Sequence, residues 1–156
     1  MDNQQGKMDK EALKHWFAGF FDGEGTIFVG RGVAKNGHIS YSPAIAVNNT
    51  HVPTQAIAEV ALKAFDVPYY VQWSEHRAKS NHAPRWFIVI RGWKRCLRAS
   101  QALLEYLHTK RVDCENMLEL CHLRVNQEGG YGYHKKPHTE RQLELIESLR
   151  GRHKTN

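Results

Sequence analysis

The feature that most constrains this chain is the segment Trp16–Gly25, which reads WFAGFFDGEG. Its aromatic residues recur at helical spacing and predict a helix with one buried face. Gly19 and Gly23 lie four residues apart, so they share a face that a second backbone can approach closely. Interior glycine costs about 0.5–1 kcal/mol relative to alanine, and close contact with a partner helix would compensate for two of them. Asp22 and Glu24 stand at the C-terminal end, where the helix dipole disfavours negative charge and a bound cation would reverse that cost.

The composition indicates an ordinary globular protein. The 156 residues are 41% hydrophobic and 24% charged, which predicts one domain over 1–156 with flexible ends at 1–8 and 150–156. The formal charge of +6 suggests a polyanion as partner but does not distinguish DNA, RNA and a membrane surface. No apolar run of membrane-spanning length and no signal peptide are present, so we expect an intracellular protein without a membrane partner.

The cysteines and histidines do not form a metal-binding pattern. The chain has three cysteines and no C-x-x-C pair, which is typical of buried thiols in a reducing compartment. His134 and His138 are four residues apart, but the Lys-Lys-Pro between them favours a loop. A structural zinc site is therefore not expected.

The hydrophobic periodicity predicts an α+β fold in which helices alternate with hairpins. An Asn-Gly turn at 36–37 joins the first two strands, and Pro43 in the second is best tolerated at an edge or a bulge. Such a sheet has an apolar face, which helices cover, and a second face that meets water or a ligand. The expected helices are 9–24, 54–65, 93–107, 112–125 and 139–149, and the expected strands are 26–32, 40–48, 69–76 and 85–91.

The segment Phe17–Gly25 resembles the LAGLIDADG motif of homing endonucleases, with the small, apolar and acidic residues in the family's order. The resemblance implies the family's αββαββα core over about residues 10–125, with an antiparallel four-stranded sheet and further C-terminal helices. The motif occurs once, as in family members that act as homodimers joined through the motif helices. The interface residues that this implies are Ala18, Gly19, Asp22 and Gly23.

The resemblance also implies a catalytic centre. The second acid of the motif, Glu24, would bind the metal ion together with the backbone carbonyl of Gly23, whereas the first acid is more often structural. Mg²⁺ (or Mn²⁺) suits this arrangement because it takes one or two carboxylates together with water and phosphate. A polar residue after the second strand, Asn49 beside Asn48, would position the attacking water, although asparagine also favours turns. Lys110 would complete a basic pocket, although it also fits a solvated helix end.

The outward face of the sheet is the expected DNA-binding surface. A strand of eight residues spans about 26 Å, and a two-stranded ribbon fits the major groove. The best base readers are Gln72, Arg85 and Arg91, and nearby lysines would hold phosphates. A solvated sheet face is the alternative, and a bulge near 30–32 would be needed to turn Arg31 outward. The full set expected at DNA is Arg31, Lys35, His38, Ser40, Ser42, Asn48, Gln72, Ser74, His76, Arg77, Lys79, Arg85 and Arg91.

These observations lead to the hypothesis of an intron-encoded, site-specific double-strand DNA endonuclease. Two subunits would form a continuous saddle over a long pseudo-palindromic site. The alternatives are a maturase that binds intron RNA, a catalytically silent DNA-binding regulator on the same fold, and a plain α+β domain. The expected location is the cytoplasm of a prokaryote or the interior of an organelle.

Overall fold

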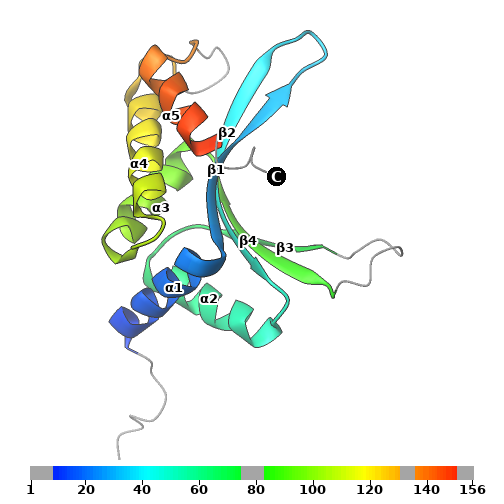
Figure 1. Ribbon diagram of the computed structural model, residues 1–156, viewed down its shortest axis with the longest axis vertical. Coiled ribbons are helices and arrows are strands. Elements are labelled where there is room, and N and C mark those ends of the chain that lie inside the picture. Colours follow the sequence, from blue (N-terminus) through cyan, green and yellow to red (C-terminus); the bar gives the residue numbers. More distant parts are fainter. Residues whose placement is uncertain (1–8, 75–82, 131–135, 151–156) are drawn as a thin grey trace, which may run out of the picture.

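The computed structural model describes residues 9–74, 83–130 and 136–150 (Figure 1). Two helix–hairpin units come first, and three further helices follow them. The elements are α1 (Lys10–Glu24), β1 (Gly25–Val33), β2 (Ile39–Asn49), α2 (Val52–Ala64), β3 (Tyr70–Ser74), β4 (Arg85–Arg91), α3 (Trp93–Leu103), a 3₁₀ turn η1 (Leu104–Tyr106), α4 (Arg111–Asn126) and α5 (Glu140–Arg150). No described helix is long and apolar enough to cross a membrane.

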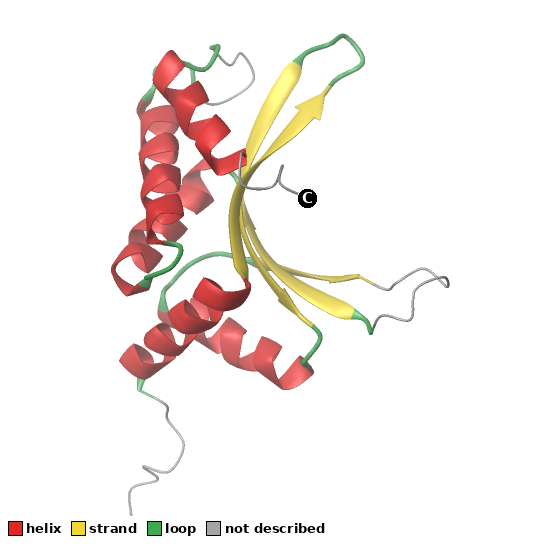
Figure 2. Ribbon diagram, viewed as in Figure 1, coloured by secondary structure: helices red, strands yellow, loops and turns green. Residues whose placement is uncertain are grey.

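The four strands form one antiparallel sheet in the order β1-β2-β4-β3. The sheet curves, and the helices pack on its convex side, while no described helix lies on its concave side (Figure 2). This arrangement confirms the predicted α+β class with helices on one face of a four-stranded antiparallel sheet. The described helices therefore leave the concave face uncovered.

The covered face follows the alternation that the sequence predicts. In β4, Trp86, Ile88 and Ile90 are buried against the helices, with at most 3% of each side chain exposed. Ile27 and Ile45 pair across β1 and β2 in the same buried layer. Because side chains in a strand alternate between faces, the intervening residues must lie on the concave side.

Helix α1 begins and ends where the sequence predicts. The side chain of Asp9 caps its N-terminus by accepting a hydrogen bond from Glu11 N, and the N–H of Gly25 donates to the carbonyl of Phe21 at the other end. A Cβ at position 25 would overlap the ring of Phe21, so only glycine allows β1 to leave the helix so tightly. The ring of Phe17 stacks on that of Phe21 inside the core.

Pro43 lies inside the sheet without interrupting it. It pairs with Val29 on one side, and on the other its carbonyl accepts a hydrogen bond from Gly92 N at 3.1 Å, just beyond the end of β4. The N–H and C=O of a strand residue point to the same side, so the donor that proline lacks would face a place where the neighbouring strand has ended. The β1–β2 register is unbroken, and the bulge considered near 30–32 does not form.

Candidate active site and nucleic-acid interface

The carboxylate of Glu24 stands exposed at the junction of α1 and β1. Its side chain makes no hydrogen bond or ion pair with another described residue. The last carbonyls of a helix, including that of Gly23, have no intrahelical partner. The described residues contain no cluster of three or more acidic, histidine or cysteine side chains suited to a metal. One carboxylate beside carbonyls that lack intrahelical partners is nevertheless the donor set that Mg²⁺ accepts when phosphate and water supply the rest.

Asp22 lies two residues earlier and has a different environment. Its carboxylate accepts hydrogen bonds from the backbone N–H groups of His108, at 2.9 Å, and Lys110, at 3.0 Å. These bonds tie the end of α1 to the turn that precedes α4. Asp22 therefore holds two segments of its own chain together, and its place at a dimer interface stays a prediction.

Lys110 lies at the same end of α1. Its Nζ donates a hydrogen bond to the backbone oxygen of Asp22 at 2.7 Å, so the ammonium group caps the C-terminal end of α1. A cation is favourable there because of the helix dipole. The predicted basic residue and the predicted metal ligand Glu24 thus converge on one helix end from positions 86 residues apart.

The two asparagines at the end of β2 have separate roles. The side-chain oxygen of Asn49 accepts hydrogen bonds from the N–H groups of Thr50 and His51, at 2.8 and 2.9 Å, and so forms the turn into α2. Asn48 points to the concave face, where its oxygen accepts a hydrogen bond from Arg85 Nη1 at 2.6 Å. Gly25 pairs with Val47, so Asn48 lies at the same end of the sheet as Glu24. The Asn49 side chain is thus engaged in the turn, whereas that of Asn48 lies on the concave face, and the role predicted for Asn49 stays a prediction.

One face of α1 is open. Apart from the adjacent residues and the nearby helix backbone, no atom of the described residues lies within 4 Å of where a Cβ would stand at Gly19 or Gly23. Trp16 and Phe20 stack beside these glycines with ring centroids 5.4 Å apart and are only partly buried. Ala18, which we expected at this surface, is 1% exposed and packs in the core of its own chain, so that expectation is corrected.

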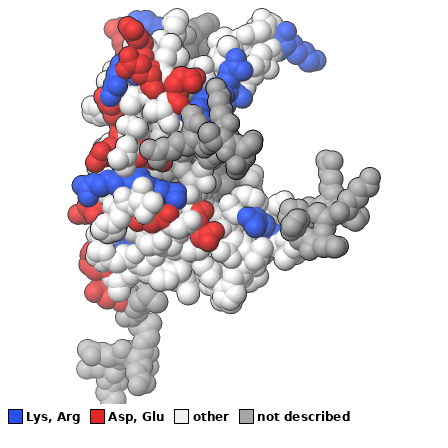
Figure 3. All heavy atoms as spheres, in the orientation of Figure 1, with Lys and Arg blue, Asp and Glu red and all other residues white. Residues whose placement is uncertain are grey.

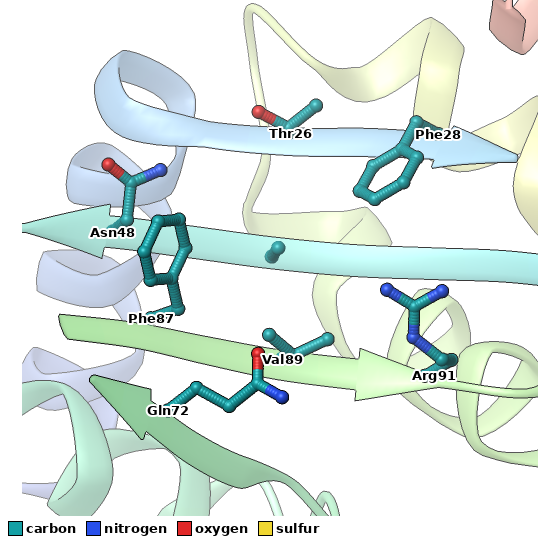
Figure 4. A pocket seen from close by; sticks show the side chains of 8 residues that line it. Thr26, Phe28, Asn48, Gln72, Phe87, Val89 and Arg91 are labelled. Atoms are coloured by element: carbon teal, nitrogen blue, oxygen red, sulfur yellow. The ribbon is translucent and has the colours of Figure 1, made fainter. Parts of the chain in front are cut away.

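The concave face is hollowed around its centre. Figure 4 shows side chains from all four strands lining this hollow, including Phe28, Phe87, Gln72 and Arg91. The ring of Phe87 lies beside Asn48 of β2, and Gln72 extends from β3, on the opposite side of β4, with its amide beside Val89. The full lining is Thr26, Phe28, Ala46, Asn48, Gln72, Phe87, Val89 and Arg91.

Charge is distributed unevenly between the two faces. The four described strands contain three arginines, namely Arg31, Arg85 and Arg91, and no Asp or Glu. The acidic side chains visible in Figure 3 gather over the helical side, and basic side chains stand at the end of the β1–β2 hairpin. The guanidinium of Arg91 also donates to Tyr70 Oη at 3.4 Å, which holds it over the sheet. A polyanion would meet no described strand carboxylate on the concave face.

Most of the predicted DNA contacts that fall on described strands share this face. Ser40, Ser42, Asn48, Gln72, Ser74, Arg85 and Arg91 all belong to its outward rows. Arg31 is exposed but pairs with Tyr41 in the row of Val29, on the other side. Lys35 and His38 lie in the β1–β2 turn region, whereas His76, Arg77 and Lys79 fall outside the described residues.

Sequence reasoning missed Phe87, which is partly buried, and Val89, which is 5% exposed, as residues that line the concave hollow. Both lie between members of the buried row of β4, and both line the concave hollow. The same alternation that identified Trp86, Ile88 and Ile90 as the inner row would have placed them outside. Their apolar character hid this, because large apolar side chains are more often assigned to the core.

No family model matches the sequence, and no curated protein matches it. Solved structures do match. The archaeal intron-encoded homing endonuclease I-Vdi141I, complexed with DNA, superposes with a TM-score of 0.67 at 13% identity over 95% of this chain and 88% of that one. The homing endonuclease I-CvuI, bound to DNA in the presence of 2 mM Mg, superposes with a TM-score of 0.59 at 16% identity, over 90% of this chain and 96% of that one.

The homing endonuclease I-TnaI gives a TM-score of 0.59 at 21% identity, over 92% of this chain and 86% of that one. The neighbours also include I-AabMI, a LAGLIDADG meganuclease bound to uncleaved DNA. At these identities the likeness establishes the fold, which is that of the LAGLIDADG homing endonucleases, as the motif predicts.

Proposed function

We propose that this protein is a homodimeric, site-specific double-strand DNA endonuclease that depends on Mg²⁺ or Mn²⁺. The observation that carries the proposal is the position of Glu24. It is an exposed carboxylate without a described partner, at the edge of a concave face whose described strands carry no acid. The DNA-bound homing endonucleases that share the fold support this reading.

A dimer through α1 would complete the site. One chain offers a single acid at this helix end, and cutting two DNA strands requires two equivalent centres. Gly19 and Gly23 leave room for the backbone of a second α1, and the Trp16–Phe20 stack borders that room with apolar surface. Because Gly23 is adjacent to Glu24, close packing here would bring the two carboxylates near the dimer axis.

The residues have distinct tasks in this proposal. Glu24 and the carbonyl of Gly23 would hold the metal ion, which when bound supplies charge neutralisation and an activated water. Lys110, held at the same helix end, would place positive charge beside the phosphate. Asn48 would orient the attacking water from the concave face, and Asn49 would keep the turn behind it in place.

Sequence recognition would use the concave face. A β-ribbon fits the major groove, and bidentate contacts from Gln72, Arg85 and Arg91 are suited to adenine and guanine edges. Two subunits related by a twofold axis would read a long pseudo-palindrome. Lys35 and His38, in the β1–β2 turn region, would extend the contacts toward phosphates. Intron encoding, an intron RNA partner and the cellular location stay predictions.

The variant Glu24→Gln tests the proposed metal ligand. It removes the charge and keeps the shape of an exposed side chain, so we expect cleavage to fall below detection while DNA affinity and the unfolding midpoint stay close to those of the parent. Plasmid or oligonucleotide cleavage and an electrophoretic mobility shift measure the two properties. Glu105→Gln is the matched control, because it removes an exposed carboxylate from η1 and should cleave normally. Cleavage by Glu24→Gln at the parental rate would contradict the assignment.

The variant Gly19→Leu tests the dimer surface. A Cβ there meets no described atom outside the helix's own nearby backbone, so the fold should persist, with a gain of up to about 1 kcal/mol from replacing glycine in a helix. The same side chain would block a second α1, and we expect monomers in sedimentation velocity and no double-strand cleavage. Glu147→Leu, which places a leucine at an exposed position of α5, should leave the dimer intact. A dimeric, active Gly19→Leu protein would place the interface elsewhere.

A further inference from the structure

The concave face has apolar side chains at its centre, where an ordinary solvated sheet would be polar. Phe28, Ala46, Phe87 and Val89 form what we call the apolar concave patch, which draws on three strands (Figure 4). Phe28 and Phe87 are only partly buried. None of the four packs into the helix-covered face, since their strand neighbours Ile27, Ile45 and Ile88 do so.

We infer that the apolar concave patch reads the 5-methyl groups of thymines, so that each half-site contains T·A pairs opposite Phe28 and Phe87. The inference rests on the proposed function. Thymine is the one standard base that presents a methyl group in the major groove, and apolar side chains such as Phe, Ala and the methyl of Thr are its usual contacts. The patch contains these residue types, with Thr26 at its margin.

Charge decides in favour of DNA as the occupant of this face. An apolar patch could also serve a protein partner or a lipophilic molecule. Here the patch lies between Arg85 and Arg91 on strands that carry no described acid. DNA gains from such flanking cations, which attract the polyanion and can bond to guanine edges beside the patch, whereas an apolar partner gains nothing from them.

The neighbours of Phe87 match the other half of a T·A pair. Gln72 is directly opposite Phe87 in the β3–β4 register, and its exposed amide makes no hydrogen bond with another described side chain or backbone group. A glutamine amide can bond to N6 and N7 of adenine in the major groove. One cross-strand pair thus presents an apolar group for the thymine methyl and an amide for its adenine partner.

The register also sets the spacing. Along the sheet, the row containing Phe87 is followed by the row of Ala46 and Val89 and then by the row of Phe28, each two residues further on. Two strand residues rise about 6.8 Å, close to two base pairs at about 3.4 Å each. We therefore expect the methyl-sensitive positions within one stretch of about four to five base pairs in each half-site, rather than scattered along it.

The test compares thymine with deoxyuridine, which lacks only the methyl group. A preferred site is first selected from random duplex DNA by binding in Ca²⁺, and thymines are then replaced by deoxyuridine in symmetry-related pairs. One buried methyl contributes about 0.8 kcal/mol, or about fourfold in Kd, so each pair opposite the patch should weaken binding about 15-fold. Pairs outside the patch should have no effect.

Variants assign the effect to side chains. Phe87→Ala should bind thymine and deoxyuridine equally well at the positions that Phe87 contacts, and Phe87→Leu should restore part of the difference. Gln72→Ala, from the same row, should bind more weakly but keep the parental thymine-to-deoxyuridine ratio. The substituted DNA probes the parental protein directly, so the outcome does not depend on how the variants fold.

The outcomes separate this inference from the proposed function. A selected site that binds equally well with deoxyuridine at every position overturns the methyl readout and leaves the endonuclease proposal intact. An effect that persists unchanged in both Phe87→Ala and Phe28→Ala overturns the assignment to the patch. Failure to select any duplex overturns the proposed function, and the inference with it.

Discussion

The two faces of the sheet are built from the same strands and have opposite character. In β4, Trp86, Ile88 and Ile90 face the helices and are almost completely buried, while Arg85 and Arg91 are exposed on the concave side. Alternation in a strand allows one residue to stabilise the fold and the next to face a ligand. Substitutions one position apart should therefore affect different properties, stability in one case and DNA binding in the other.

The two acidic residues of the motif also differ in their surroundings. Asp22 holds the turn before α4 through two backbone amides, and Glu24, two residues later, is exposed at the edge of the concave face. Both belong to one motif, yet among the described residues Asp22 is hydrogen-bonded to backbone amides and Glu24 is not hydrogen-bonded through its side chain. The contrast shows that a pair of neighbouring carboxylates in a sequence need not share a function.

The largest effect on the covered face should come from Trp86→Ala. Trp86 is 0% exposed, and its indole N–H donates to the carbonyl of His51 at 3.0 Å. Loss of a buried tryptophan costs about 3–5 kcal/mol, which chemical denaturation would measure. The adjacent Arg85→Ala should change the free energy of unfolding by no more than about 0.5 kcal/mol. Equal losses from the two variants would contradict the division between faces.

On the open face, Arg91→Ala should weaken binding to the preferred DNA site by about 1–3 kcal/mol and relax specificity at one base pair. Its side chain is exposed, and its hydrogen bond to Tyr70 Oη is long, at 3.4 Å. The unfolding midpoint should therefore hardly change. Fluorescence anisotropy with the preferred and substituted duplexes measures both affinity and specificity. A uniform loss on all sequences would make Arg91 a phosphate contact instead.

A smaller effect should appear at alkaline pH on the covered side. Burial raises the pKa of the Cys96 and Cys114 thiols to about 12, and burial also raises the pKa of Cys121. The unfolded chain ionises these thiols near their ordinary pKa, so it binds fewer protons than the folded chain and stability falls as pH rises. Each thiol should lower the free energy of unfolding by about 1.3 kcal/mol between pH 8 and pH 9.5.

Urea denaturation at the two pH values measures this loss, and Cys96→Ala should lose less stability over the interval than its parent. The comparison uses the change with pH, so the cavity left by the substitution does not enter it. A parent protein whose stability is constant from pH 8 to pH 9.5 would show that the thiols are not protected by burial.

Local patterns were sufficient to predict much of the fold. The cap at Asp9, the stop at Gly25 and the inner row of β4 all depend on residues a few positions apart, and each lies where the sequence places it. The predicted order of helices and hairpins also follows from short-range periodicity. The expected helix 93–107 is correct up to Leu103 and then tightens into a 3₁₀ turn.

The parts of the site that escaped prediction depend on long-range contacts. The bonds of Asp22 join residues 86 and 88 positions apart, and no local pattern signals such a contact. The different contacts of the adjacent residues Asn48 and Asn49 depend on the register of β2 and on the turn into α2. Ala18 resembles its neighbouring glycines in size, yet only the packing of α1 shows that it is buried.

Cleavage of a randomised duplex DNA library, in parallel with Mg²⁺ and with EDTA, tests the central claim most directly. We expect one long, nearly palindromic sequence to be cut with Mg²⁺ and no sequence to be cut with EDTA. Cleavage that is unaffected by EDTA would contradict the metal site at Glu24. Retention of DNA without cleavage under either condition would contradict the nuclease and indicate a silent DNA-binding protein on this fold.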